Sequence, residues 1–431
     1  MAIRNPLVPA DRWLLLAAAF VLGNLALLAI TAPPALRWQP VVMALAWAAA
    51  ALSLRQAVQR HTPAAPPRLP ALALTLSGWG LMGIWRVMPA YGVRQAFALV
   101  LAAWAATLLL ARPRLLPWLR RNAFPLLLGG LALLAPTVVV GRHPAGAGPR
   151  LWLGCCGAYF QPAALFKVLL VIALAAEGRR WRPGLAAATL TAAALLAAQQ
   201  DFGTAVFLTA LYAAAEACLW QRRLPLALTA AAALPAGGWA LHTLPVARQR
   251  LEAWLTPSRS PQRYGYQILQ AEHALHVGGI FGLGLKPPTA VPLAHSDFIF
   301  VAIANGWGLF GALVLMAMLA ALPLLALHLA GPRHTFPQRL TAAAGLYLGG
   351  QTLVVLGGNL RLLPLTGMPL PFVASGGSAL LAVFLTLGVL LQANGRASSL
   401  PSPKNAARWC FRLFLAAFTL AALATGWWML P

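Results

Sequence analysis

The chain has 431 residues, of which 60% are hydrophobic and only 9% are charged. A soluble domain usually carries roughly 25% charged residues, and a soluble fold of this length would leave far more charge on its surface. The formal net charge is +25, which in a soluble protein would suggest nucleic-acid binding. Here the arginines stand in short loops between apolar segments, as in membrane proteins. We therefore expect an integral membrane protein that contacts membrane lipids and no nucleic acid.

Long apolar segments recur along the whole chain. A hydrocarbon layer about 30 Å thick needs about 20 helical residues to cross it. We identify 13 candidate spans, at residues 13–31, 39–54, 69–86, 95–111, 124–140, 161–177, 183–199, 202–220, 224–241, 297–327, 340–358, 369–393 and 412–430. The sequence thus predicts an all-α polytopic membrane protein.

Basic residues in alternate loops predict how these spans are oriented. With a cytoplasmic N-terminus, every inner loop carries Arg or Lys, which is the bias expected of cytoplasmic loops. The residues concerned are Arg4, Arg12, Arg55, Arg60, Arg68, Arg112, Arg114, Arg120, Arg121, Arg179, Arg180, Arg182, Arg222, Arg223, Arg333, Arg339, Arg396, Lys404, Arg408 and Arg412. Thirteen spans then place the C-terminus outside the cytoplasmic membrane.

Residues 243–296 form a long outer segment that is unusually basic for its side of the membrane. It contains Arg248, Arg250, Arg259, Arg263 and Lys286. Long loops escape the charge rule, so simple tolerance explains these residues. Recognition of an anionic ligand at the outer surface explains them equally well, and both interpretations stay open on this evidence.

Three charged residues lie beside or within apolar spans. Asp201 and Asp297 each stand at the outer boundary of a span, where a carboxylate either caps the following helix or belongs to a binding site. Lys167 lies inside a span and needs a partner there. Gln199, Gln200, Asp201 or an anionic ligand would serve.

Five motifs, in order over about residues 70–395, resemble the SEDS family (shape, elongation, division and sporulation proteins). They are Arg150-Leu-Trp-Leu-Gly154 with Gln161-Pro162 and Lys167; Gln199-Gln-Asp-Phe-Gly-Thr204; Tyr266-Gln267 with Gly278–Gly284; His295-Ser296-Asp297; and Leu363–Phe372 with Gly376-Gly-Ser378. The resemblance implies a ten-span core at 61–395, with the large outer loop at 243–296. Residues 1–60 would then add two spans, and 396–431 a cytoplasmic linker and a third extra span.

The activity that this resemblance implies is that of a peptidoglycan glycosyltransferase, which polymerises lipid II beside a class B penicillin-binding protein. Asp297 matches the family's catalytic Asp and would act as general base. The candidate substrate-binding residues are Arg150, Lys167, Asp201, Arg248, Arg250, Gln267, His295 and Ser296. A divalent cation, Mg²⁺ or Mn²⁺, would help to neutralise the departing pyrophosphate, although no protein residues are assigned to a metal site.

The chain departs from the family at several acidic positions. Ala164, Leu293, Asn305 and Gly306 stand where the family has Glu, and Ala374-Ser375 replaces a Ser-Tyr pair. These departures keep a second hypothesis open, in which the protein has weak or no activity. It would then bind or flip a lipid-linked precursor and scaffold cell-wall synthesis. An ion-coupled transporter is disfavoured, because it would need more acids deep within its spans.

Overall fold

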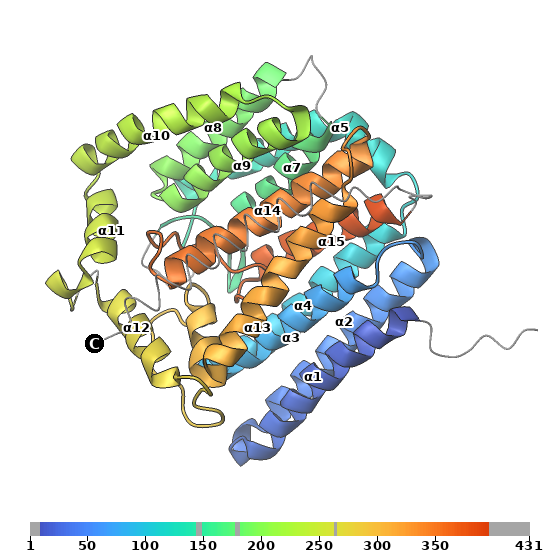
Figure 1. Cartoon of the computed structure of the whole chain (residues 1–431), viewed down its shortest axis with the longest axis vertical. Helices are drawn as coiled ribbons and strands as arrows, with labels where there is room; N and C mark the ends of the chain where they lie inside the picture. The colour runs from blue at the N-terminus through green and yellow to red at the C-terminus, as the bar shows by residue number, and fades with distance from the viewer. Residues whose placement is uncertain (1–8, 144–148, 177–181, 263–264, 396–431) are drawn as a thin grey trace, which may run out of the picture.

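The computed structural model describes residues 9–143, 149–176, 182–262 and 265–395, which fold into a bundle of long helices (Figure 1). The long helices are α1 (Pro9–Thr31), α2 (Trp38–His61), α3 (Arg68–Val87), α4 (Pro89–Leu110), α5 (Leu115–Leu134), α7 (Pro162–Ala176), α8 (Arg182–Ala198), α9 (Phe202–Trp220), α10 (Leu224–Thr243), α13 (Ile299–Leu329), α14 (Phe336–Asn359) and α15 (Gly377–Asn394). The shorter elements are η1 (Pro34–Leu36), α6 (Thr137–Val140), α11 (Pro245–Leu255), η3 (Pro257–Arg259), α12 (Tyr266–Gly278), and strands β1 (Leu153–Cys155) and β2 (Ala158–Phe160), which pair as an antiparallel hairpin.

The composition of these helices identifies a polytopic membrane protein. Within the described part of the chain, eight helices are long and apolar enough to cross a membrane, and α7, α8 and part of α10 are shorter apolar helices. Helix α4 shows the expected two faces: Leu99 is fully buried, whereas Leu101 and Trp104 are 63% and 57% exposed. Many other large apolar side chains point outward along these helices, as expected where the surrounding solvent is itself apolar.

Twelve of the thirteen predicted spans coincide with helices of the structure, while 412–430 and the linker from residue 396 lie outside the described residues. Several predicted boundaries differ from the structure by four residues or more, and two of these differences have a clear cause. The 369–393 span begins only at Gly377, because Pro369 and Pro371 lack the N–H that a helix interior needs. The 124–140 span is divided at Pro136, between α5 and α6.

Glycines allow the segment 360–376, between α14 and α15, to lie against the bundle. A Cβ atom on Gly80 of α3 would stand 2.3 Å from the carbonyl oxygen of Val373, and one on Gly203 of α9 would stand 2.5 Å from that of Thr366. Any larger residue would push this segment away. Small residues thus fix the position of a non-helical stretch at one end of the bundle, as they do at helix contacts in membranes.

Helix α13 is broken near its first turns. Gly308 has φ 69°, and the chain from Gly279 runs beside it, so that Leu309 N donates to the Gly279 carbonyl at 2.8 Å. Leu283 N likewise donates to the Asn305 carbonyl at 2.9 Å. The segment after α12 therefore provides hydrogen-bond partners for backbone groups around the break, which lipid could not provide.

Candidate active site

A cavity of about 320 Å³ opens where α11, α12, the start of α13 and the 360–376 segment meet. Its lining residues are Val246, Gln249, Arg250, Ala253, Gln267, Ile268, Asp297, Leu365 and Gly367. The four residues from α11 lie at positions i, i+3, i+4 and i+7, so they occupy one face of that helix. Asp297 is the one acid in this lining and Arg250 the one base, so the cavity is polar and carries opposite charges.

Asp297 is held in a tight turn just before α13. Its backbone N–H donates to the Leu293 carbonyl at 3.0 Å, and the Asn359 side-chain amide donates to its carbonyl at 2.7 Å. Burial raises the pKa of the Asp297 carboxyl to about 6, while a hydrogen bond from Ser296 and the charge of Arg250 lower it and the charge of Asp201 raises it. The carboxyl is therefore suited to exchange a proton near neutral pH.

Asp201 and Lys167 are two buried charged residues, and the charge of each acts on the pKa of the other. Asp201 caps α9 by accepting a hydrogen bond from Thr204 N at 3.2 Å. Burial raises the pKa of the Asp201 carboxyl, while the hydrogen bonds from Thr204 and the charge of Lys167 lower it. The Lys167 amine is 4% exposed and donates to Gln351 Oε1 at 3.0 Å, and Gln351 in turn donates to the Pro369 carbonyl. Neither charged residue is among the cavity-lining residues.

His295 and Ser296 take different positions although they adjoin Asp297. His295 stacks on Tyr91 with ring centroids 4.5 Å apart, and its Nδ1 lies 2.7 Å from Ser375 Oγ. Burial lowers the pKa of His295, which favours the neutral ring. The Ser296 hydroxyl donates to the Leu293 carbonyl at 3.4 Å, and its hydrogen bonding lowers the pKa of the Asp297 carboxyl. His295 therefore joins the turn to the 360–376 segment, whereas Ser296 acts on the candidate base.

The arginines predicted to bind substrate are separated by the fold. Arg250 lines the cavity, together with Gln267 of α12. Arg248 is exposed and donates to the Leu241 carbonyl at 3.2 and 3.3 Å, which closes the turn between α10 and α11. Arg150 is exposed beside the hairpin, and its carbonyl oxygen would lie 2.3 Å from a Cβ on Gly141. The cavity thus includes one of the three arginines.

The structure shows what surrounds Asn305 and Gly306, two of the positions where the family resemblance led us to expect acids. Asn305 donates to the Ala274 carbonyl and to Thr289 Oγ1, and it accepts from Thr289 N. The guanidinium of Arg86 occupies the space beside Gly306, where a Cβ would be only 1.7 Å from Nη1. The Asn305 amide therefore connects α13 to α12, and Arg86 of α3, which donates to the Lys286 carbonyl, fills the space beside Gly306.

Sequence reasoning missed Val246, Gln249 and Ala253, which line the cavity with Arg250. Their spacing was a readable signal, because residues three, four and seven positions apart share a helix face. It also missed Arg361, whose partners lie about 90 to 107 positions away along the chain. No local pattern reveals contacts of that kind.

A helical membrane bundle with a partly buried acid and an arginine lining one cavity at its end defines a membrane protein suited to proton-transfer chemistry on an anionic ligand. The chain belongs to the FtsW/RodA/SpoVE family, described as cell cycle proteins, which it matches over residues 88–399.

Named relatives and solved structures agree with this assignment. The peptidoglycan glycosyltransferase RodA of Mycobacterium tuberculosis is 30% identical over 88% of this chain and 88% of its own length. The probable peptidoglycan glycosyltransferase FtsW of Caulobacter vibrioides is 32% identical over 63% of this chain and 72% of its own. A chain from a peptidoglycan synthase complex that coordinates polymerization and crosslinking matches with a TM-score of 0.62 and 32% identity, covering 76% of this chain and 96% of that one. The crystal structure of Thermus thermophilus rod shape determining protein RodA matches with a TM-score of 0.54 and 28% identity, covering 77% and 97%.

Proposed function

We propose that this protein is a peptidoglycan glycosyltransferase that polymerises lipid II. The observation that carries the proposal is the partly buried carboxyl of Asp297, which lines a cavity that also presents Arg250. Relatives that share most of the chain carry the name of this activity. The same cavity with two apolar residues in their place would offer neither a proton acceptor nor a charge for a pyrophosphate.

The residues of the cavity suit the bond changes of this reaction. Asp297 takes the proton from the 4-hydroxyl of the acceptor sugar as that oxygen attacks the anomeric carbon of the donor. The bond from that carbon to the lipid pyrophosphate breaks, and the negative charge that develops on the pyrophosphate is stabilised by Arg250. Gln267 adds an uncharged hydrogen-bonding group to the same cavity.

A divalent cation fits the donor set of the cavity only with help from the substrate. Mg²⁺ is usually held by one or two carboxylates together with substrate phosphates, and Asp297 is the one acid in the lining. Among the described residues, no group of three His, Cys, Asp or Glu side chains could hold a metal alone. Asp297 and the pyrophosphate would therefore share Mg²⁺ or Mn²⁺, which would supply positive charge for the leaving group.

The proposal includes a location and a partner. The arginine-rich loops support a cytoplasmic N-terminus in the cytoplasmic membrane. This orientation puts the starts of α9, α13 and α15, and hence the cavity, at the outer face. The matching chain from a peptidoglycan synthase complex supports a class B penicillin-binding protein as the partner.

A second candidate function is binding or flipping of a lipid-linked precursor without polymerisation. It is favoured by two positions where the family has acids: Asn305 holds structural hydrogen bonds, and Gly306 leaves room for Arg86. This function needs the cavity and Arg250 but no proton acceptor, so Asp297 separates the two functions.

The deciding experiment is lipid II polymerisation by the purified full chain with its penicillin-binding protein, with transpeptidation blocked and glycan strands resolved on gels. We expect strands from the unmodified protein and a loss of at least about 100-fold in Asp297→Asn, the usual size of a lost general base. Glu252→Gln is the control, because Glu252 lies on α11 but not in the cavity lining. Equal rates for the unmodified protein and Asp297→Asn, or no strands from either, would reject the enzyme in favour of the second function.

A further inference from the structure

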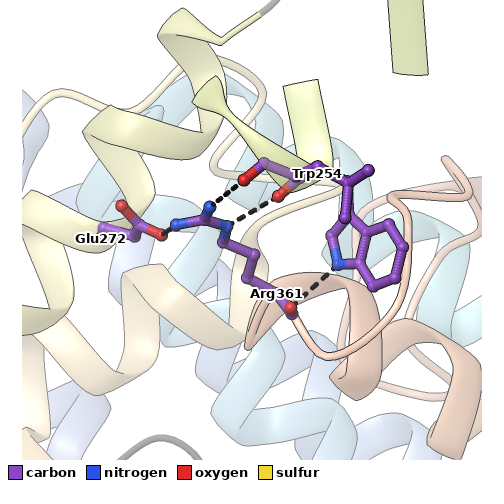
Figure 2. A network of polar contacts seen from close by, with 4 residues as sticks. Trp254, Glu272 and Arg361 are labelled. Carbon is purple, nitrogen blue, oxygen red and sulfur yellow. Dashed lines mark hydrogen bonds and ion pairs between the residues drawn. The ribbon is translucent and has the colours of Figure 1, made fainter. Parts of the chain in front are cut away.

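Arg361 connects three walls of the cavity. Figure 2 shows its guanidinium between Trp254 and Glu272: Nε donates to the Trp254 carbonyl at 2.8 Å, Nη2 to the Leu255 carbonyl at 2.9 Å, and Nη1 to Glu272 Oε1 at 2.7 Å. In return, Trp254 Nε1 donates to the Arg361 carbonyl at 2.9 Å. These contacts link α11, α12 and the 360–376 segment, which all contribute residues to the cavity.

The backbone at Arg361 takes a conformation that only glycine adopts without cost. Its φ is 55°, in the left-handed region, where a Cβ crowds the following carbonyl oxygen. Sites that keep such a conformation are over-determined by their surroundings and cluster at functional positions. Here both the side chain and the carbonyl of Arg361 are engaged, so the strained turn directs the guanidinium toward the end of α11.

Helix α11 depends on this contact because little else holds it. Of its 11 residues only Ala253 is buried. The helix packs chiefly against α10 and η3, its neighbours along the chain. The carbonyls of Trp254 and Leu255 lie in its last turn, where helix carbonyls lack intrahelical partners, so Arg361 caps the helix. The first turns of α11 are fixed separately, because Arg248 donates to the Leu241 carbonyl of α10.

The same contact determines how α11 is rotated. Trp254 and Arg250 stand four positions apart and therefore share one face of the helix. Two hydrogen bonds at the Trp254 residue, one through its backbone carbonyl and one through its indole, restrict rotation about the helix axis. Arg250 consequently keeps its place in the cavity, where its charge acts on Asp297.

We propose that Arg361 is a positioning residue for this glycosyltransferase: it fastens α11 to α12 and to the end of α14, so that Arg250 faces Asp297 across the cavity. The proposal rests on the proposed function for its catalytic consequence, but the fastening itself is a property of the protein without substrate. Arginine suits this role better than lysine, because its planar fork reaches two carbonyls and a carboxylate at once.

The first test measures hydrogen–deuterium exchange of residues 245–255 in the purified full chain in lipid nanodiscs. The variant is Arg361→Gly, which removes the fork and relieves the left-handed backbone, so that the relief offsets part of the lost hydrogen bonds. Arg333→Gly is the matched control, because Arg333 has φ 63° and donates to a carbonyl, that of Cys218, before α14 begins. We expect exchange of α11 to quicken about tenfold in Arg361→Gly only. Equal exchange of α11 in Arg361→Gly and the unmodified protein would overturn the proposal.

The second test asks whether Arg361 acts through Arg250. Lipid II polymerisation is measured for Arg361→Gly, Arg250→Gln and the double variant. We expect Arg361→Gly to lower kcat about tenfold alone but less than about twofold in the Arg250→Gln background, because coupled residues do not add. Independent, multiplying effects would overturn the positioning role. Failure of the unmodified protein to polymerise lipid II would overturn the proposed function instead. The exchange experiment would then still show whether Arg361 holds α11 in place.

Discussion

The rate of strand synthesis should fall steeply as the pH is lowered through about 6. Burial raises the pKa of Asp297 to about 6, and a general base works only in its deprotonated form. The carboxyl is then about 90% ionised at pH 7 and about 9% ionised at pH 5, a loss of about tenfold in rate. A carboxyl with the ordinary pKa of 3.8 would lose less than about 10% of its ionised form over the same interval.

Two variants should shift the pH dependence of the rate in opposite directions. The charge of Arg250 lowers the pKa of Asp297, so Arg250→Gln should move the acidic limb of the rate profile to higher pH. The charge of Asp201 raises it, so Asp201→Asn should move the limb to lower pH. Asn also keeps the N-cap of α9.

The assay is the initial rate of lipid II polymerisation between pH 5 and 8 at low substrate, with the penicillin-binding protein present and its transpeptidase inhibited. At low substrate the profile reports kcat/KM and hence groups of the free enzyme. Glu252→Gln should leave the limb unchanged, because Glu252 lies outside the cavity lining. A rate that stays constant from pH 7 to pH 5 would refute the assignment of Asp297 as base. So would acidic limbs of the rate profile that move in the same direction in Arg250→Gln and Asp201→Asn.

Three further outcomes are expected. Asp297→Asn should raise the thermal unfolding midpoint at pH 8, and by less at pH 5. The pKa of Asp297 is raised from 3.8 to about 6 on folding, so its ionised form costs about 3 kcal/mol of stability above that pKa; a lowered midpoint would contradict this. Gly203→Ala should reduce polymerisation about tenfold or more, since its Cβ would meet the Thr366 carbonyl oxygen at 2.5 Å and displace the 360–376 segment. Gly129→Ala, whose Cβ would meet nothing within 4 Å, should not. Chelation with EDTA should stop synthesis and Mg²⁺ or Mn²⁺ should restore it; undiminished synthesis in EDTA would remove the cation from the proposal.

The helices were predictable because hydropathy acts on every residue of a span at once. Twelve spans were located from apolar length, since lipid imposes a minimum of about 20 residues on each crossing. Boundaries were less certain where two signals compete, as at Pro369 and Pro371, which follow apolar residues yet prevent a helix. The roles proposed for Asp297 and the other site residues stay predictions until the variants are assayed.

The contacts that build the cavity were much harder to predict. Lys167 was expected to need a partner, and Asp201 was among those considered, but its hydrogen-bond acceptor is Gln351, 184 positions away. Arg248 and Arg250 are equivalent by charge and nearly adjacent, yet only the rotation of α11 decides that Arg250 enters the cavity. The partner of Lys167 and the rotation of α11 both depend on tertiary packing, which no local pattern in the sequence reveals.

The break at Gly308 has a mechanical consequence. Helix α13 has 31 residues, about 46 Å if straight, whereas the hydrocarbon layer is about 30 Å thick. A continuous rod of that length would have to tilt with every change in membrane thickness, and would swing the turn that bears Asp297 with it. The left-handed glycine, with the 279–284 segment bonded beside it, acts instead as a joint between the long membrane helix and its first turns. Asp297 can therefore stay in the cavity beside Arg250 while the remainder of the helix adjusts to the surrounding lipid.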